Sequence, residues 1–285
     1  MHLSVHYSPF TIHGFWGGEM AEQEKNGIHE LTRFAMEVVR SSGEKALSYY
    51  GKGLPAIKFD EGLVTEAELQ LGAFFQDQLA MHFPEHRVFN NNQDNQAYTH
   101  VGDGALWVYD PLDGVANFQA GIPIWGVSLA LLENFWPVFG MFYMPATGDL
   151  FHASAGQKAF RGEESILVSS QENIDDESLL FTYSRFHNHF QSTFPGKIRS
   201  LGCTTAHMCY VAMGRAEAAL IANESYQDLA AARVIVEASG GKIYKMDGSE
   251  FFLNEYLDGQ RIAEPLMVTA PAIYSQVLET LQPVY

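Results

Sequence analysis

The sequence predicts a mixed fold, with an antiparallel α+β first half and an α/β second half that join near residue 155. Apolar segments at 124–132, 136–144 and 148–153 are separated by turn residues, a pattern typical of an antiparallel meander. Between residues 178 and 244, short strand-like segments alternate with helix-like ones, which is typical of an α/β unit. We therefore predict three parts: an N-terminal arm at 1–20, an α+β domain at 21–155 and an α/β domain at 156–285.

In the first half, apolar residues at a spacing of three to four predict a helix over 21–50, with Gly51 and Gly53 after it as stop signals. The run 65–68 has the form of a capping box and predicts that Thr65 is the N-cap of a second helix, which extends to about His82. Residues 104–110 predict a strand, and 145–148 predicts a hairpin turn.

In the second half, the same patterns predict four strands and two helices. The strands are expected at 178–183, 197–202, 216–222 and 242–244, and the helices at 204–213 and 228–239. Gly214 and the pair Gly240-Gly241 follow the two helices as C-terminal caps.

Composition limits the class of protein and its partners. The chain has 285 residues, of which 47% are hydrophobic and 18% charged, as expected for a globular protein with a substantial core. Its net charge of −17 argues against nucleic acid as a partner. The sequence contains no apolar stretch long enough to span a membrane and no secretory signal. The two cysteines, Cys203 and Cys209, match no zinc pattern and fit a reducing compartment, so we expect a cytoplasmic protein.

Residues 1–20 leave two alternatives open. Their His, Tyr, Phe and Trp content is consistent with an arm that packs on the body of the protein or on a partner, and equally with a disordered leader.

The most informative segment runs from Trp107 to Phe118. Apolar residues lead directly to Asp110 and Asp113, with Pro111 between them and Gly114 after them, which predicts a strand that ends in a sharp turn. Two carboxylates on a stiff turn are typical of a site for a hard cation such as Mg²⁺. The alternative is an Asx-type turn, in which the acids accept hydrogen bonds from local amides.

Two further positions are candidates for a site. Asp228 lies at a strand-to-helix junction, where the residue type alone favours an N-cap role. Gly202, Cys203 and Thr204 form a glycine turn that opens a helix, a geometry suited to anions but common to many helices.

Three segments, in order, resemble motifs of the inositol monophosphatase family. Residues 110–118 resemble its metal-binding signature, D-P-(L/I)-D-G-(T/S)-x-x-F, and residues 227–241 resemble its second signature, W-D-x-A-A followed by E-A-G-G. Between them, residues 197–206 resemble the R-x-x-G-(S/T)-A-A segment. The resemblance covers residues from about 28 to 282.

The resemblance implies a layered α-β-α-β-α sandwich with an antiparallel N-terminal sheet and a mixed C-terminal sheet. It also implies Mg²⁺-dependent hydrolysis of the phosphate monoester of a small sugar or polyol, a reaction often inhibited by Li⁺. We expect a homodimer, and Mn²⁺ is the alternative cation. The implied metal ligands are Asp110, the Leu112 carbonyl, Asp113, Asp228 and the residue at position 91. Asp113 and Glu68 match catalytic positions of the family. The amides of Gly114 and Val115 match its phosphate-binding positions, and Gly202, Cys203 and Thr204 match positions that contact the substrate.

The chain departs from the family pattern inside this implied site. Asn91 replaces a metal-bridging Glu, and Val115 replaces a Thr that helps to activate the attacking water. Loss of a carboxylate ligand weakens cation binding, so we expect fewer ions than the family norm. Loss of the Thr hydroxyl removes a proton relay worth about 10²–10⁴ in rate.

Three other positions also differ. Glu68 stands where the family has Asp, Gln227 where it has Trp, and Ile221 where an acidic residue typically contacts an inositol hydroxyl. We therefore expect inositol not to be the best substrate.

Two interpretations stay open. The first is an active phosphatase with an altered site, in which Asp94, Asp103 or Glu85 replaces the missing ligand; the second is an inactive family member that serves as a phosphate- or metal-binding or regulatory module. The sequence has no basic cluster near the motifs that would favour an adenosine bisphosphate. Lys197 and Arg199 either meet an extra phosphate or are exposed charges on a strand edge, and we expect His207 to be a packing residue.

Overall fold

The computed structural model describes residues 18–53, 61–89, 104–133, 136–253 and 261–284. The chain divides into two compact units, Met1–Phe34 and Ala35–Tyr285. The described part of the first unit is the beginning of helix α1, Gly18–Leu47. The second unit holds the remaining elements and is described from here on by itself. This division does not test the domain boundary predicted near residue 155.

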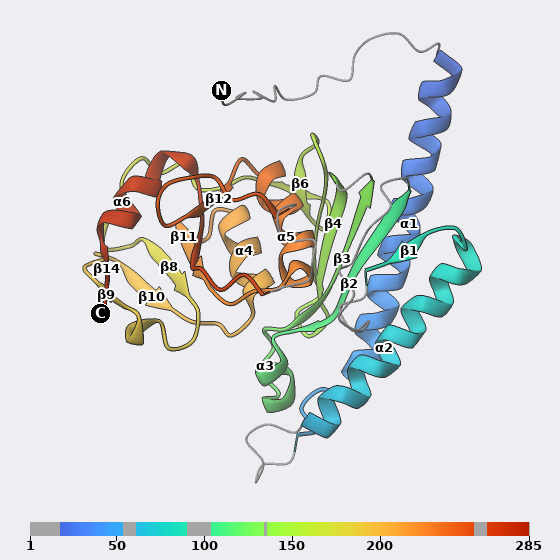
Figure 1. Cartoon of the computed structure of the whole chain (residues 1–285), viewed down its shortest axis with the longest axis horizontal. Helices are drawn as coiled ribbons and strands as arrows, with labels where there is room; N and C mark the ends of the chain where they lie inside the picture. Colours follow the sequence, from blue (N-terminus) through green and yellow to red (C-terminus); the bar gives the residue numbers. More distant parts are fainter. Residues whose placement is uncertain (1–17, 54–60, 90–103, 134–135, 254–260, 285) are drawn as a thin grey trace, which may run out of the picture. The chain divides into compact units, whose positions relative to one another are not determined.

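The second unit alternates helices with three sheets (Figure 1). After α1, the α-helices are α2 Glu61–His82, α3 Val115–Ala120, α4 Thr204–Ala212, α5 Tyr226–Ala238 and α6 Tyr274–Glu279. Two 3₁₀ helices, η1 Phe186–Asn188 and η3 Pro271–Ile273, complete the described helical segments. The strands are β1 Arg87–Val88, β2 Ala105–Asp113, β3 Gly126–Glu133, β4 Trp136–Met144, β5 Asp149–Ser154, β6 Ala159–Arg161, β7 Glu164–Ile166, β8 Leu179–Thr182, β9 Phe190–Ser192, β10 Lys197–Arg199, β11 Ala218–Ile221, β12 Lys242–Lys245, β13 Leu266–Thr269 and β14 Leu281–Pro283.

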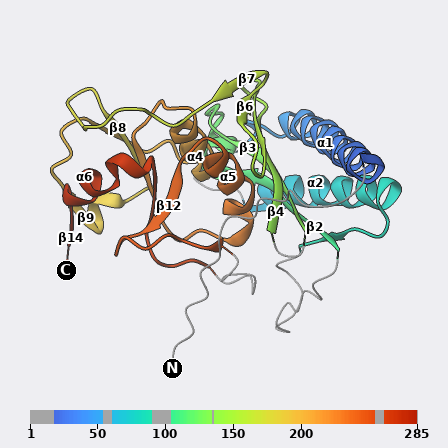
Figure 2. The same ribbon diagram turned by 90° about the horizontal axis from the view of Figure 1, so that it is seen from above.

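Helices and sheets form successive layers, seen edge-on in Figure 1 and from above in Figure 2. A seven-stranded sheet, β1 to β7 in order, has α2 and the second half of α1 on one face and α4 and α5 on the other. The next layer is a five-stranded sheet in the order β10-β8-β11-β13-β12, and α6 lies beyond it. The predicted α-β-α-β-α sandwich is therefore confirmed.

Strand directions agree with the predicted sheet types, with one exception. In the seven-stranded sheet β2 to β7 are antiparallel neighbours, whereas the two-residue strand β1 runs parallel to β2. In the second sheet β10, β8 and β11 run parallel to one another, whereas β13 runs antiparallel to both of its neighbours, β11 and β12. The sheet is therefore mixed, as expected.

Apolar burial explains why α5 occupies the centre. Its run from Leu229 to Val236 is buried on all sides because the helix is covered by both sheets and by α4. Gly140 in β4 permits this packing, since a Cβ there would clash with the Ala231 backbone of α5. A helix apolar all round belongs in the interior of a protein.

Several element boundaries differ from the prediction. Helix α2 begins at Glu61, so Thr65 lies inside it and is not its N-cap. Strand β2 continues through Asp113 instead of ending at residue 110, and α3 follows it at once. The strands β9, β13 and β14 and the helix α6 were not expected, because each is short and lacks strong periodicity. No helix among the described residues is long and apolar enough to cross a membrane.

Candidate functional site

A bulge in β2 sets the positions of the two acids of the first motif. Asp110 is opposite Ser128 of β3 and Asp113 is opposite Gly126, so β2 contains one residue more than its partner between these pairs. Pro111 occupies the bulge, where it removes no ladder hydrogen bond that a regular strand would need. Bulges redirect side chains and are frequent beside active sites. The predicted sharp turn is therefore a bulged strand, held partly by the Leu112 amide, which donates to Asp110 Oδ1 at 3.1 Å.

Gly114 converts the strand into helix α3. It has φ of 84° and is the N-cap of α3, so the chain reverses immediately after Asp113. A Cβ at this position would lie 2.8 Å from the Ile124 carbonyl oxygen and 3.0 Å from Cys203 Cβ. Only glycine fits here, which explains why the D-G pair occurs at the end of this strand.

Asn117 fastens α3 to the start of α4. Its Nδ2 donates to the carbonyls of Ile124 at 2.7 Å and Leu201 at 2.6 Å. It also packs against Gly202, whose φ is 76° and where an added Cβ would lie 3.1 Å from the Asn117 amide. The first motif and the predicted substrate segment at 202–204 are thereby brought together.

Asp113 caps helix α4 from outside that helix. Its Oδ2 accepts hydrogen bonds from the Thr205 amide at 2.6 Å and from Cys203 Sγ at 3.2 Å. Cys203, which is the N-cap residue by position, makes no side-chain cap of its own. A carboxylate at a helix N-terminus is favoured by the free amides and by the helix dipole. The carboxylate predicted as a metal ligand thus also joins β2 to α4.

Asp228 lies at the start of α5, although it is not the N-cap. Ser225 is the N-cap, and its Oγ accepts from the Asp228 amide at 3.3 Å while Asp228 Oδ2 accepts from the Ser225 amide at 2.6 Å. This reciprocal pair is a capping box, and it corrects the N-cap role predicted for Asp228. Gln227 ties the same turn to the first motif, because its Nε2 donates to the Tyr109 carbonyl at 3.1 Å.

The elements enclose a cavity of about 730 Å³. Five of its lining residues are positions predicted for the site: Glu68, Asp110, Leu112, Val115 and Asp228. The rest of the lining is Leu69, Gly72, Ala73, Gln76, Pro111, Ser225, Gln227 and Arg261. The structure therefore brings the acids predicted to bind a cation, the glutamate predicted at a catalytic position and Val115, which replaces the family's Thr, to one concave surface.

Electrostatics at this cavity are unfavourable for the ionised acids alone. Burial raises the pKa of Asp110 well above its ordinary value, and the negative charges of Asp228 and Asp113 raise it further. Burial likewise raises the pKa of Asp228, with Asp113 adding to the effect, and burial raises the pKa of Glu68. A cation would relieve this repulsion and favour the ionised forms.

The donor set fits a hard cation. Asp110 and Asp228 supply carboxylate oxygens to the cavity, and Leu112, predicted to bind through its carbonyl, lines it as well. Within the described ranges no group of three or more His, Cys, Asp or Glu side chains is arranged to hold a metal ion. Mg²⁺ is commonly held by one or two carboxylates with water and substrate phosphate completing the shell, so two acids and a carbonyl are adequate.

Other predicted positions lie outside the cavity lining or outside the described residues. Asn91, together with Asp94 and Asp103, is not among the described residues. Glu85 is exposed and does not line the cavity. The lining also does not include Asp113, Gly114, Gly202, Cys203 and Thr204.

The structure agrees with the non-catalytic roles considered for three basic residues. Lys197 pairs with Glu177 at 2.6 Å on the edge strand β10, and Arg199 is exposed on the same strand. His207 is buried, stacks on Phe181 with ring centroids 5.1 Å apart and accepts at Nε2 from the Leu201 amide at 2.8 Å. It is a packing residue, as expected.

Two charged residues near the cavity were missed. Glu224 is buried three residues after Ile221, accepts from Thr204 Oγ1 at 2.9 Å, and has its pKa raised to about 8 by burial and then by Asp228 and Asp113. Ile221 itself is fully buried in β11. The polar run at 223–225 after a buried strand was the available signal for Glu224, because strand ends carry sites in α/β units. Arg261 had no such signal, since it lies far along the chain.

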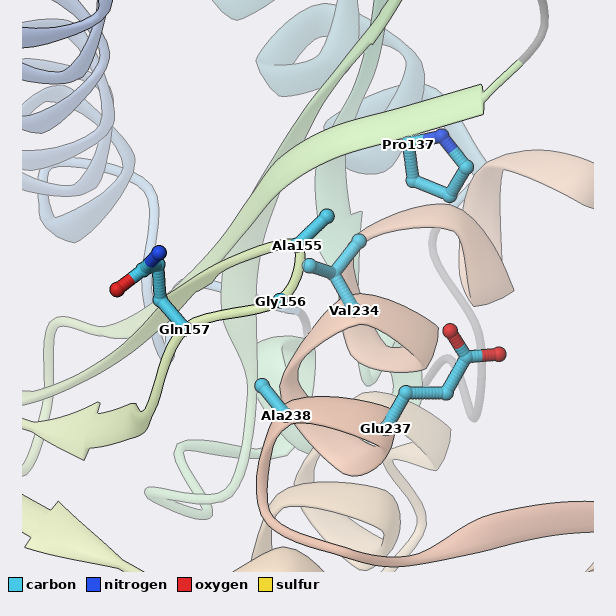
Figure 3. Close-up of a pocket in the computed structure, with 7 residues that line it drawn as sticks. All are labelled: Pro137, Ala155, Gly156, Gln157, Val234, Glu237 and Ala238. Atoms are coloured by element: carbon cyan, nitrogen blue, oxygen red, sulfur yellow. The ribbon is translucent and has the colours of Figure 1, made fainter. Parts of the chain in front are cut away.

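A second cavity, of about 300 Å³, lies between α5 and the end of β5 and has no comparable chemistry (Figure 3). Its one acidic lining residue is Glu237, which pairs with Arg233 at 2.6 Å. In Figure 3 Glu237 and Gln157 lie on opposite sides of the cavity and point away from each other. The acid-lined cavity is therefore the candidate site.

Comparisons with known proteins identify the family of the chain. A sequence profile described as the inositol monophosphatase family matches residues 28–282. The histidinol-phosphatase of Chlorobaculum parvum is 29% identical over 232 residues, which cover 78% of this chain and 88% of that protein. Inositol monophosphatase 1 of Solanum lycopersicum is 29% identical over 280 residues, which cover 90% of this chain and 97% of that protein.

Solved structures show the same fold. The Thermotoga maritima IMPase superposes with a TM-score of 0.72 at 23% identity, and the match covers 88% of this chain and 96% of that one. The match of the family profile over nearly the whole sequence, on a shared fold, shows that this chain belongs to the inositol monophosphatase family.

Proposed function

We propose that this chain is a Mg²⁺-dependent phosphomonoesterase of low turnover that acts on a small sugar or polyol phosphate. The observation that carries the proposal is the shared cavity lined by Asp110, Leu112 and Asp228 together with Glu68. Members of the family are phosphatases and generally use Mg²⁺. Mn²⁺ is the alternative cation, and a cytoplasmic homodimer stays the expected form.

Each residue of the candidate site has a distinct proposed role. Asp110, Asp228 and the Leu112 carbonyl hold the cation, which when bound offsets the charge of the phosphate and activates water. The amides of Gly114 and Val115 at the start of α3 are proposed to bind the phosphate, and of these two residues Val115 lines the cavity. Glu68, whose pKa is raised by burial, accepts the proton of the attacking water. Asp113 positions the α4 segment 203–205 through the Thr205 amide.

Low turnover follows from Val115. It lines the cavity with Glu68 but has no hydroxyl with which to relay a proton from water to that carboxylate. Such proton transfer typically contributes about 10²–10⁴ in rate. Asn91, which replaces a charged ligand with a neutral one, reduces the number of cations held.

The same Val115 favours a second candidate function. With the relay absent, the cavity retains oxygen ligands for a cation but lacks part of the machinery that makes water a nucleophile. A non-catalytic protein that binds a metal ion and a phosphorylated ligand is therefore the alternative, and it differs from the first in one measurable quantity, turnover.

Phosphate release in Mg²⁺ tests the proposal, with myo-inositol 1-phosphate and histidinol phosphate as substrates. We expect slow release by the wild type, loss of release in Asp110→Asn and no change in Asp176→Asn, which makes the same substitution on the surface. The double variant Asn91→Glu, Val115→Thr is expected to raise kcat by tenfold or more.

The outcomes separate the candidates. Fast wild-type turnover would contradict the degenerate site. No turnover by the wild type, with a gain in the double variant, would support the binding protein. Wild-type release unaffected by Asp110→Asn would show that the phosphatase site lies elsewhere.

A further inference from the structure

Arg261 brings a positive charge into a cavity whose other charged lining residues are all acidic. Of the described residues that line the 730 Å³ cavity, Arg261 is the one basic side chain, whereas Glu68, Asp110 and Asp228 are acids. The whole chain has 17 basic residues against 34 acidic ones, so composition alone does not predict a positively charged side chain at this cavity.

Two contacts, one made by Arg261 and one by the residue after it, fix its position. Its Nη1 donates to the Asn223 carbonyl, and the next residue, Ile262, forms a β-bridge with Glu224 in which its amide donates to the Glu224 carbonyl at 2.8 Å. Arg261 is thus held beside the loop between β11 and α5, which leads into the first turn of α5, where Asp228 lies. A guanidinium has five N–H donors, so the bond to Asn223 leaves donors for a ligand in the cavity.

The cavity is larger than a phosphate requires. Its volume of about 730 Å³ is in the range of sites that enclose a whole small organic molecule. The residues proposed to bind the cation and the phosphate lie in β2, at the start of α3 and at the start of α5. Arg261 lies in none of these elements, since it comes between β12 and β13 in the chain. Leu69 and Ala73 of α2 add an apolar part to the lining.

We propose that Arg261 is a specificity-determining residue that binds a second anionic group of the substrate, a carboxylate or a second phosphate, and so favours phosphate monoesters that carry such a group over polyol monophosphates that do not. This inference rests on the proposed phosphate site. Arginine suits the role because its planar fork binds carboxylate and phosphate through two parallel hydrogen bonds. Ile221 is consistent with it, since a buried isoleucine offers no acceptor to a polyol hydroxyl.

A matched pair of phosphonates tests the inference without turnover, because a phosphomonoesterase does not cleave a carbon–phosphorus bond. Ethylphosphonate and 3-phosphonopropionate share the phosphonate and differ in a terminal carboxylate. Calorimetry in Mg²⁺ is expected to show that the wild type binds 3-phosphonopropionate about tenfold more tightly than ethylphosphonate. The preference should disappear in Arg261→Gln and be reduced but not abolished in Arg261→Lys, which keeps the charge without the planar fork. It should be unchanged in Arg199→Gln, which removes an exposed charge from β10.

Kinetics give the same comparison for substrates. In Arg261→Gln we expect the KM of fructose 1,6-bisphosphate to rise about tenfold and that of myo-inositol 1-phosphate to stay within twofold. Equal wild-type affinity for the two phosphonates would overturn the inference, as would equal weakening of both by Arg261→Gln, which would place Arg261 at the shared phosphorus group. No binding of either phosphonate by the wild type would refute the phosphate site itself, and the inference with it.

Discussion

Gly114 makes the sharpest structural demand in the candidate site, and Gly114→Ala is the substitution that tests it. The residue stands at φ of 84° between β2 and α3, directly after Asp113. An added Cβ would lie 2.8 Å from the Ile124 carbonyl oxygen and 3.1 Å from Trp125 Cα, both of which are backbone atoms just before β3. Neither atom can rotate away as the end of a flexible side chain can.

Two terms set the size of the effect. An alanine in the left-handed region costs about 1–2 kcal/mol because of its Cβ. Displacing packed backbone adds about 1–3 kcal/mol, typical of overpacked interiors. The expected loss is therefore about 3 kcal/mol of unfolding free energy, a large fraction of the stability of an ordinary domain.

Gly121→Ala is the matched control at the other end of α3. Gly121 has φ of 74°, but an added Cβ would meet only Gly51 Cα, at 3.7 Å. It is expected to lose only the conformational term, about 1–2 kcal/mol. Urea unfolding followed by tryptophan fluorescence measures both, since the buried Trp125 packs on Phe118 of α3 with ring centroids 4.8 Å apart. Equal losses in the two variants would refute the close backbone approach assigned to Gly114.

Two more predictions concern the second half. Burial lowers the pKa of His207 from 6.5 to about 4, so the folded protein binds a proton at this imidazole less well than the unfolded chain does. The free energy of unfolding therefore has its full value above about pH 6.5 and decreases as the pH falls toward 4. Wild type should lose about 3 kcal/mol more than His207→Gln between pH 7 and pH 4 in urea titrations, and parallel pH profiles would contradict the assignment. Ser225→Ala removes the side-chain half of the α5 capping box and should cost about 1 kcal/mol in the same assay, whereas an unchanged midpoint would show that the cap contributes nothing.

Local chemistry explains what the sequence could predict. The meander from β3 to β5 follows from alternation and a turn at residues 145–148, and α4 and α5 follow from apolar spacing and glycines at their ends. The run from Asp110 to Phe118 pointed to the candidate site because its one proline and one glycine suit the local backbone geometry. Each of these signals is contained within a few neighbouring residues.

Other features depend on distant partners and had no local signal. The β2 bulge exists because of the register with β3, which an isolated strand sequence does not specify. Asp113 caps α4 across 92 positions of sequence, and Arg261 reaches the cavity from outside every recognised motif. At α5, residue type alone favoured Asp228 as the N-cap, but Ser225, three residues earlier, has the extended backbone conformation of the N-cap and Asp228 completes the capping box.

Calorimetric titration of Mg²⁺, with and without inorganic phosphate, tests the central claim most directly. That claim is that Asp110 and Asp228 form a cation site that also binds phosphate. The account predicts saturable Mg²⁺ binding that phosphate strengthens, with binding lost in Asp110→Asn and Asp228→Asn and kept in Asp176→Asn. Mg²⁺ binding that is absent, indifferent to phosphate, or unchanged in the two cavity variants would contradict it.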